Sequence, residues 1–196
     1  MSTFLPGVEA GLKPGPYTTL VEAARRDGRE YSKIWDLFAF APETMHHLSH
    51  LTQGIMRQPA SITAGMRELI AAYTSYQNDC RFCTKAHAAA ASELLGDEAL
   101  VWSALKDLES SPLEARDKAL LRFIGKVTTN LPGVIGEDVA DLRAVGWDDE
   151  AIYFAISACA LFNFYNRWIT ATGVPEMSPE AHRLQGKNLA RGYVRD

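Results

Sequence analysis

The stretch from Glu68 to Ala91 constrains the fold most, because a turn signal lies there between two segments with helical patterns. Asn78 and Asp79 provide the turn signal, and a new helix is predicted to begin at Cys80 directly after them. Both segments carry a packing face, formed by Met66, Leu69, Ile70 and Tyr73 before the turn and by Ala86, Ala88 to Ala91 and Leu94 after it. We therefore predict two helices folded back on each other as a hairpin.

The predicted hairpin gathers a carboxylate, two thiols and an imidazole. Cys80 and Cys83 form a C-x-x-C pair in the first turn of the second helix, where the helix dipole favours thiolate over thiol. His87 follows Cys83 by four residues, so it lies on the same helix face and can take the thiol proton. On one straight helix Glu68 would lie about 18 Å from Cys80. The hairpin instead brings Glu68 level with Cys83 to His87, at the edge of apolar packing that is expected to raise its pKa and let it exchange protons.

Two other interpretations of the cysteine pair compete with redox chemistry. A structural zinc site normally has four Cys or His ligands, and the sequence contains no second C-x-x-C. Two free cysteines can also meet by chance in a core, but chance does not account for a His one helical turn later. Elsewhere, Glu43, His46, His47 and His50 resemble a metal-binding spacing but fall off the inner stripe of their helix. We expect redox-active thiols and no metal.

The same residues, with their spacing, resemble the pattern of a known group of proteins. The pattern Glu68, Cys80-Arg81-Phe82-Cys83 and His87 resembles the alkyl hydroperoxidase D (AhpD) and carboxymuconolactone decarboxylase superfamily, and most of all its peroxidase-related, AhpD-like branch. The segment Phe162 to Arg167, followed by Ala171 to Pro175, supports the resemblance, which covers roughly residues 30 to 180. One departure is that AhpD has a His directly before its second cysteine, where this chain has Phe82. The decarboxylases proper generally lack the cysteine pair.

The resemblance implies a fold and an activity. The expected fold is all-α, an AhpD-like helical bundle with the C-x-x-C at the N-terminus of a central helix, assembled as a homo-oligomer, a trimer or hexamer. The expected activity is that of a thiol-dependent peroxidase, like an alkyl hydroperoxide reductase, with a Glu68 and His87 proton relay. Cys83 is expected to attack the hydroperoxide and Cys80 to close the disulfide. The reverse order remains open, because in many C-x-x-C oxidoreductases the first cysteine is the nucleophile.

Reduction of a hydroperoxide takes two electrons, and a pair of thiols can supply both by forming a disulfide. No cofactor is therefore expected. The electron donor would be an external dithiol, such as a thioredoxin-like protein or lipoamide. Three alternatives stay open: a carboxymuconolactone decarboxylase-like enzyme, a disulfide reductase or electron-transfer adaptor, and a binding module without catalysis.

A long apolar helix is predicted from near Trp147 to Thr172, and polar residues interrupt it. Asn163, Asn166 and Arg167 must be hydrogen-bonded or functional if they are buried. They either line the thiol pocket together with Phe82 or satisfy loop carbonyls or an oligomer interface. The apolar run ahead of them is too short to cross a bilayer.

The length, composition and charge of the chain limit its domain number and its partners. The 196 residues are 47% hydrophobic with a formal net charge of -4, which suits one good core and argues against nucleic-acid or anionic-membrane partners. Three cysteines do not form a secreted disulfide framework, so a cytoplasmic location is expected.

We predict an irregular N-terminal arm and first helical segment over residues 1–30 and a single AhpD-like domain over residues 31–196. Further helices are predicted at Ala41–Gln58, Glu98–Leu108, Leu113–Thr129, Gly136–Val145 and from Ser178 onward.

Overall fold

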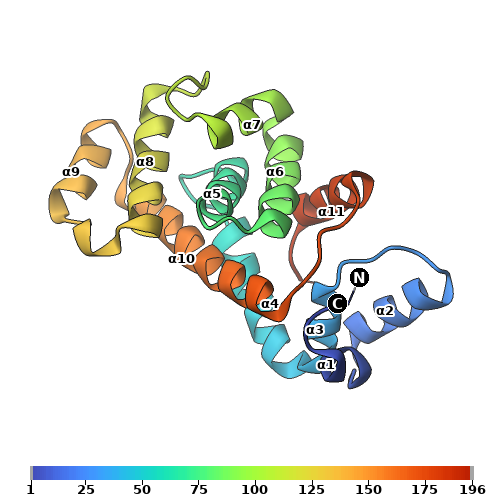
Figure 1. Cartoon of the computed structure of the whole chain (residues 1–196). Helices are drawn as coiled ribbons and strands as arrows, with labels where there is room; N and C mark the ends of the chain where they lie inside the picture. Colours follow the sequence, from blue (N-terminus) through green and yellow to red (C-terminus); the bar gives the residue numbers. More distant parts are fainter. Residues whose placement is uncertain (1, 195–196) are drawn as a thin grey trace.

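The structure, a computed structural model, describes residues 2–194, and within that range it consists of helices without any strand (Figure 1). The elements in chain order are α1 (Pro6–Ala10), α2 (Pro16–Arg26), α3 (Ile34–Phe40), α4 (Pro42–Arg57), α5 (Ala64–Gln77), α6 (Arg81–Leu95), α7 (Glu98–Lys106), α8 (Ala115–Thr129), η1 (Leu131–Gly133), α9 (Gly136–Ala144), α10 (Asp149–Thr172) and α11 (Pro179–Arg191). The predicted all-α fold is confirmed. The predicted helix boundaries after residue 41 agree with these to within about two residues.

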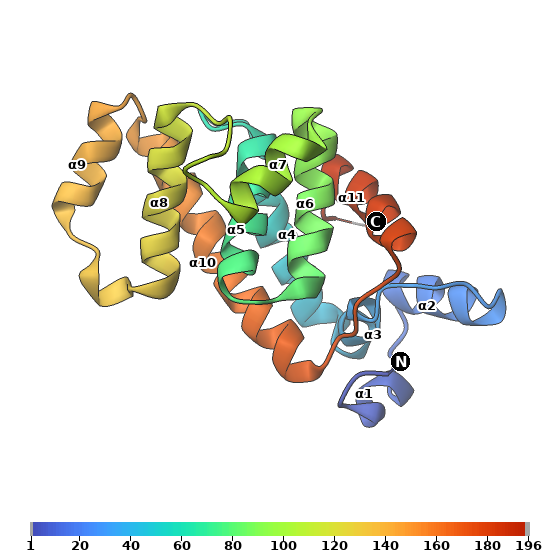
Figure 2. The ribbon, with the colours of Figure 1, turned by 45° about the horizontal axis from the view of Figure 1, so that its top comes forward.

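Helix α5 is the centre of the molecule. Every residue from Gly65 to Ser75 is buried, and α4, α6, α7, α8 and α10 pack around it (Figures 1 and 2). The helix begins at Thr63, whose hydroxyl accepts a hydrogen bond from the Met66 N–H at 3.1 Å. A chemically active side chain on α5 is therefore shielded from solvent on all sides.

The turn between α5 and α6 forms the predicted hairpin. Asp79 adopts a left-handed backbone conformation with φ 52°, which reverses the chain after Asn78. The Cys80 N–H donates to the Ser75 carbonyl at 2.9 Å, and Cys80 is the N-cap of α6. The two thiols thus lie at the N-terminal end of a helix that packs directly on α5.

Helix α11 packs closely on α6, on the opposite side from α7 (Figure 1). A Cβ atom added at Gly186 would lie 2.5 Å from Ala89 Cβ and 2.7 Å from the Ala89 carbonyl carbon. Only a glycine fits at this crossing, so the pair fixes the position of α11 along α6. The small-residue face predicted on α6 therefore contacts both neighbours, α5 and α11.

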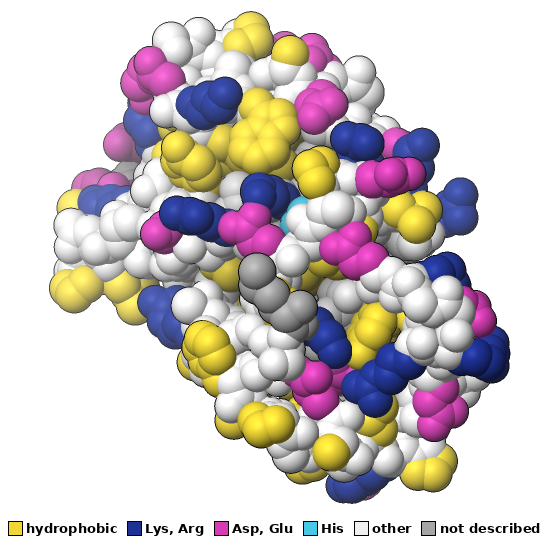
Figure 3. Space-filling view, turned by 45° about the vertical axis from the view of Figure 1, so that its right-hand side comes forward, with side chains coloured by type: hydrophobic (Ala, Val, Ile, Leu, Met, Phe, Trp, Pro, Cys, Tyr) yellow, Lys and Arg dark blue, Asp and Glu magenta, His cyan; other side chains and the backbone are white. Residues whose placement is uncertain are grey.

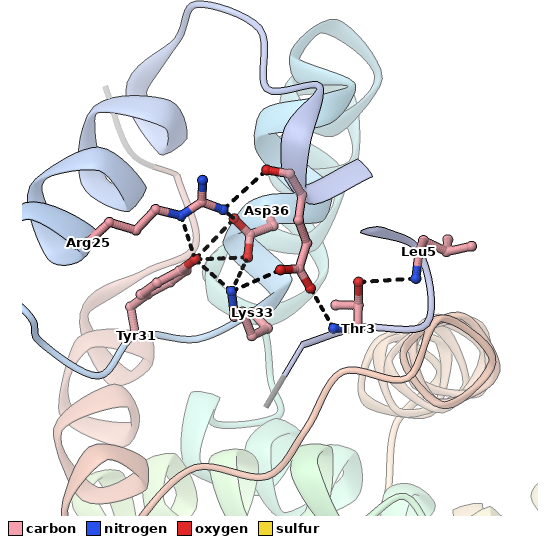
Figure 4. A network of polar contacts seen from close by, with 7 residues as sticks. Thr3, Leu5, Arg25, Tyr31, Lys33 and Asp36 are labelled. Atoms are coloured by element: carbon pink, nitrogen blue, oxygen red, sulfur yellow. Dashed lines mark hydrogen bonds and ion pairs between the residues drawn. The ribbon is translucent and has the colours of Figure 1, made fainter. Parts of the chain in front are cut away.

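Helices α1, α2 and α3 lie together at one end of the molecule (Figures 1 and 2). A fully buried carboxylate, Asp36, joins them: it accepts from Arg25 at 2.7 Å and from the Tyr31 hydroxyl at 3.0 Å, and pairs with Lys33 at 3.1 Å (Figure 4). Buried charges of this kind persist only where all partners are in place. The network therefore ties α2 to the start of α3.

The first residues are more regular than the sequence suggests. Pro6 starts the short helix α1, where its missing N–H costs nothing. Glu9 in this helix accepts from the Thr3 N–H at 2.5 Å and pairs with Lys33 at 3.2 Å (Figure 4). The predicted irregular arm thus contains one short helix, Pro6–Ala10, and is otherwise irregular from residue 2 to residue 15.

Helix α10 packs against α4, α5 and α8 and is buried along one side, including Cys159 and Phe162. Asp148 caps it by accepting from the Ala151 N–H at 2.7 Å. Across residues 2–194, no helix combines the length and apolar character needed to span a bilayer.

Candidate functional site

Glu68 and His87 form a buried pair between α5 and α6. The Glu68 side chain is 0% exposed, and its Oε2 lies 2.7 Å from His87 Nδ1. The hairpin produces this contact, since it places the α5 carboxylate opposite the second turn of α6. The predicted meeting of these two residues is therefore present in the structure.

Two further residues, not identified from the sequence, complete this pair. The second oxygen of Glu68, Oε1, accepts from Arg57 Nη2 at 2.5 Å and from the Tyr193 hydroxyl at 2.6 Å. Arg57 ends α4, and Tyr193 follows α11. The carboxylate therefore has a cation and a hydroxyl on one oxygen and the imidazole on the other.

These partners change the electrostatic character expected of Glu68. Burial raises its pKa, but the charge and hydrogen bond of His87, the charge of Arg57 and the hydroxyl of Tyr193 outweigh burial and lower it. The sequence-based expectation of a raised pKa was wrong, because it considered apolar packing and no donors. Glu68 is a fixed carboxylate inside the core.

Cys80 and Cys83 are both free thiols, and their pKa values are shifted in opposite directions. A hydrogen bond from the Cys83 thiol, with help from the Cys83 backbone N–H, lowers the pKa of Cys80 to about 6 despite burial. The hydrogen bond to Cys80 and burial raise the pKa of Cys83. In the reduced protein one proton is thus shared unequally, with the thiolate on Cys80 and the thiol on Cys83.

A cavity of about 140 Å³ lies beside Cys83 and His87. An engineered apolar cavity of similar size holds one benzene ring. Its walls are mostly aromatic and aliphatic and come from distant parts of the chain, among them Tyr17, Trp35, Phe38, Phe82, Ala86, Phe162, Tyr165, Ile169, Leu184 and Tyr193. Cys80 is not among the lining residues. A ligand in the cavity would therefore meet Cys83 first.

The cavity lies between the α2 and α3 end of the molecule and helices α6, α10 and α11. Figure 3 shows the side of the molecule that carries α2 and α11, where positive and negative side chains are interspersed with hydrophobic ones. A field of one sign, which would attract strongly charged substrates, is not apparent on this face.

Of the residues predicted to line the thiol pocket, only Phe82 lines the cavity. Asn166 and Asn163 instead accept from the Asn78 side chain at 2.9 and 3.0 Å, and Asn166 also donates to Ser75 at 2.9 Å. Arg167 bonds to Asn163 Oδ1 at 2.7 Å. Asn163 and Asn166 hydrogen-bond to the α5–α6 turn that positions the thiols, whereas Arg167 is exposed and bonds to Asn163. Asn166 also hydrogen-bonds to Cys83, so it contacts a thiol without lining the cavity. Asn163 and Arg167 do not line the cavity.

No group of three or more His, Cys, Asp or Glu side chains between residues 2 and 194 could hold a metal ion. The rings of His46 and His50 lie 4.1 Å apart between centroids and are tilted by 44°, and His50 Nδ1 donates to the His46 carbonyl at 2.8 Å. These imidazoles lie on the outer face of α4, at some distance along the chain from the thiol pair. They contribute nothing to the site around Glu68.

Arg57 and Tyr193 carried only weak sequence signals. An arginine at the end of an amphipathic helix is ordinary, since cations favour helix C-termini. Tyr193 stands in a polar C-terminal segment without periodicity. The single hint is chemical: a buried Glu requires donors, and His87 alone leaves one oxygen unpaired.

Comparison with known proteins agrees with this geometry. The sequence model of the carboxymuconolactone decarboxylase family matches residues 42–99, the span from α4 to the start of α7 that contains Glu68, both thiols and His87. No curated protein matches the chain in sequence.

Solved structures share the fold over most of the chain. An uncharacterized peroxidase-related protein from Silicibacter sp. TM1040 is 27% identical, with a TM-score of 0.74 over 87% of this chain and 90% of the other. An uncharacterized peroxidase-related protein from Ralstonia eutropha JMP134, solved as an alkylhydroperoxidase AhpD core, is 22% identical, with a TM-score of 0.74 over 87% and 88%. A protein of unknown function from Agrobacterium tumefaciens is 21% identical, with a TM-score of 0.60 over 72% and 95%. Residues 42–99 thus match the carboxymuconolactone decarboxylase family, and these likenesses show that the chain shares its helical fold with AhpD-like proteins and support a place in that superfamily.

Proposed function

We propose that the protein is a thiol-dependent peroxidase that reduces hydroperoxides through Cys80 and Cys83. The observation that carries the proposal is the shared position of Cys83 and His87 on the wall of one apolar cavity, with Cys80 hydrogen-bonded behind Cys83. A nucleophile and a base thus adjoin a space that fits an organic group, and the resolving thiolate contacts the nucleophile from outside this space. The likeness to peroxidase-related proteins supports the same assignment.

The first step is attack by Cys83 on the distal oxygen of a hydroperoxide, ROOH. The Cys83 proton passes to His87, one helical turn further along α6. As the O–O bond breaks, His87 returns this proton to the departing alkoxide, which leaves as ROH. Sulfur is oxidised by two electrons and becomes a sulfenic acid, Cys83–SOH.

The second step closes the disulfide. The Cys80 thiolate attacks the sulfur of Cys83–SOH, the S–O bond breaks, and the departing hydroxide takes a proton from solvent and leaves as water. In the reduced protein the Cys83 hydrogen bond lowers the pKa of Cys80 to about 6, so Cys80 enters the cycle as a thiolate. An external dithiol, a thioredoxin-like protein or lipoamide, then reduces the disulfide and returns both thiols. No further cofactor is part of this cycle.

Glu68 has a different role from the one its sequence context suggests. Its pKa is lowered by His87, Arg57 and Tyr193 against the effect of burial, so it does not carry a proton at neutral pH. It accepts a hydrogen bond from His87 Nδ1, so Nε2 is the ring nitrogen that can exchange a proton with Cys83. Glu68 therefore orients the base, in the manner of the carboxylate in a catalytic triad.

A thiol count before and after one equivalent of cumene hydroperoxide tests the proposal. Wild type should lose two thiols rapidly, with mass spectrometry locating the disulfide between Cys80 and Cys83. Cys159→Ser is the matched control: this thiol is buried in α10 beside Thr128, and its loss should leave the reaction unchanged. Survival of both thiols in wild type would refute peroxidase function.

The order of attack needs separate variants. In Cys80→Ser, a sulfenic acid should accumulate on Cys83 and react with dimedone. If instead Cys83→Ser accumulates sulfenic acid on Cys80 at the wild-type rate, Cys80 is the attacking thiol and the cavity is not the peroxide site.

A cysteine-independent enzyme of the carboxymuconolactone decarboxylase type is the second candidate, favoured by the family match over residues 42–99. It predicts that a Cys80→Ser and Cys83→Ser double variant keeps activity on a lactone substrate. Loss of all activity in that variant would exclude it.

A further inference from the structure

We infer that Tyr193 is a positioning residue of the reaction proposed above: its hydroxyl, with Arg57, fixes Glu68 so that His87 is held as the base for Cys83. The role of His87 as a base rests on the proposed function, whereas the contacts of Tyr193 with Glu68 and His87 do not depend on it. It adds the segment after α11 to the working parts of the site.

The Tyr193 hydroxyl contacts both members of the buried pair. It donates to Glu68 Oε1 at 2.6 Å and lies 3.4 Å from His87 Nδ1. Burial and the neighbouring Glu68 charge raise the pKa of Tyr193, so the phenol keeps its proton and acts as a donor. A hydroxyl that only filled space would not need to meet the carboxylate at this distance.

The Tyr193 ring is held in place from several sides. The Arg57 guanidinium lies over it at 5.0 Å from the centroid, and the His87 ring lies nearly parallel to it, 12° between planes and 6.4 Å between centroids. Its backbone N–H donates to Gln53 Oε1 at 2.7 Å. The ring is thus held by contacts from α4 and α6, and these contacts agree with the hydrogen bond from the hydroxyl to Glu68.

Arg57 links the same group of residues to α11. Its Nη2 donates to Glu68 Oε1 and also to the Leu189 carbonyl at 2.6 Å. The C-terminal turn of α11 is therefore bound to the carboxylate through one guanidinium, while Tyr193 binds it directly. A shift of α11 would move the donors of Glu68.

The two carboxylate oxygens of Glu68 determine which nitrogen of His87 carries a proton. Glu68 Oε1 is occupied by Arg57 and Tyr193, so Oε2 is the oxygen that faces His87. A carboxylate only accepts, so His87 Nδ1 must carry a proton and Nε2 is the nitrogen that can take one from Cys83. Without the Tyr193 hydroxyl, Oε1 keeps only Arg57, and water can replace the phenol beside Nδ1.

Tyr193→Phe tests the inference, since it keeps the ring and removes only the hydroxyl. In wild type the Nδ1 proton of His87 should appear as a downfield NMR resonance that exchanges slowly with water; it should be absent in His87→Gln. In Tyr193→Phe we expect exchange of this proton to become about tenfold faster, the effect of losing one hydrogen bond to a charged group. The rate constant for cumene hydroperoxide reduction should fall by a similar factor, with KM unchanged.

Tyr153→Phe is the matched control, because it removes a hydroxyl from a tyrosine that is 65% exposed on α10. It should leave both the resonance and the rate at wild-type values. Thermal unfolding of each variant shows whether the fold is intact.

The two proposals fail in different ways. Slow proton exchange and unchanged turnover in a folded Tyr193→Phe would overturn the positioning role. A wild-type protein that does not consume hydroperoxide would refute the proposed function, while faster exchange in Tyr193→Phe would still support the positioning of His87.

Discussion

Replacing Glu68 with Gln should destabilise the protein far more than a single charge removal on the surface. Glu68 is fully buried and satisfies donors from three elements: Arg57 on α4, His87 on α6 and Tyr193 after α11. Gln has one acceptor oxygen instead of two. In either orientation its NH₂ group therefore faces donors, at His87 or at Arg57 and Tyr193.

The expected loss can be worked from these contacts. The Arg57 side chain is only 8% exposed, so it would remain as a buried cation without its counter-charge. Removing one partner of a buried ion pair costs about 3–5 kcal/mol. That is a large share of the roughly 5–15 kcal/mol by which domains are stable. Glu109→Gln is the control, since the Glu109–Arg122 pair at 3.0 Å is exposed and should contribute under about 1 kcal/mol.

Urea unfolding of wild type and Glu68→Gln at several pH values gives the measurement. Because the folded pKa of Glu68 is lowered, its stabilising effect is present above the unfolded pKa, about 4.3, and is lost as the pH falls through the folded value. The difference in free energy of unfolding should therefore be constant from pH 6 to 8 and narrow below about pH 4. A loss under about 1 kcal/mol at pH 7, or a difference that widens in acid, would refute the reasoning.

Two further predictions concern the thiols and the α6–α11 crossing. Iodoacetamide labelling of Cys80 should titrate near pH 6 in wild type, and Cys83→Ala should move the midpoint upward because the S–H donor is lost; an unchanged midpoint contradicts the thiol hydrogen bond. Gly186→Leu should lower stability by about 1–3 kcal/mol in thermal unfolding, since its side chain must displace Ala89. Gly54→Ala, inside α4 with only a 3.9 Å contact, should instead raise stability by about 0.5–1 kcal/mol; equal effects of the two variants would refute the packing argument.

Local signals in the sequence were sufficient to predict the hairpin and the polar groups that gather on it. Asn78 and Asp79 marked the reversal, and the one-turn spacing of Cys83 and His87 placed both on one face of α6. Such signals act within a few residues, so they survive in the folded protein. The meeting of Glu68 with His87 followed from the hairpin alone.

The remaining parts of the site depend on contacts that no local pattern encodes. Tyr193 meets Glu68 across 125 positions of the chain, and its segment shows no periodicity. The pKa direction of Glu68 depended on Arg57 and Tyr193, and was predicted wrongly without them. Asn166 shows the same limit: the sequence indicated that a buried amide needs partners, but not that Asn78 and Ser75 would provide them.

The long sequence separation between Tyr193 and Glu68 also bears on how the molecule folds. Contacts close in sequence form with a small loss of chain entropy, as between Glu68 and His87, which are 19 positions apart. We therefore expect the α5–α6 hairpin to form early in folding and the segment after α11 to dock late. In that interval the thiols are present on a helix that nothing yet covers. Refolding without a reductant should accordingly produce disulfides between chains, and added dithiothreitol should raise the yield of native protein.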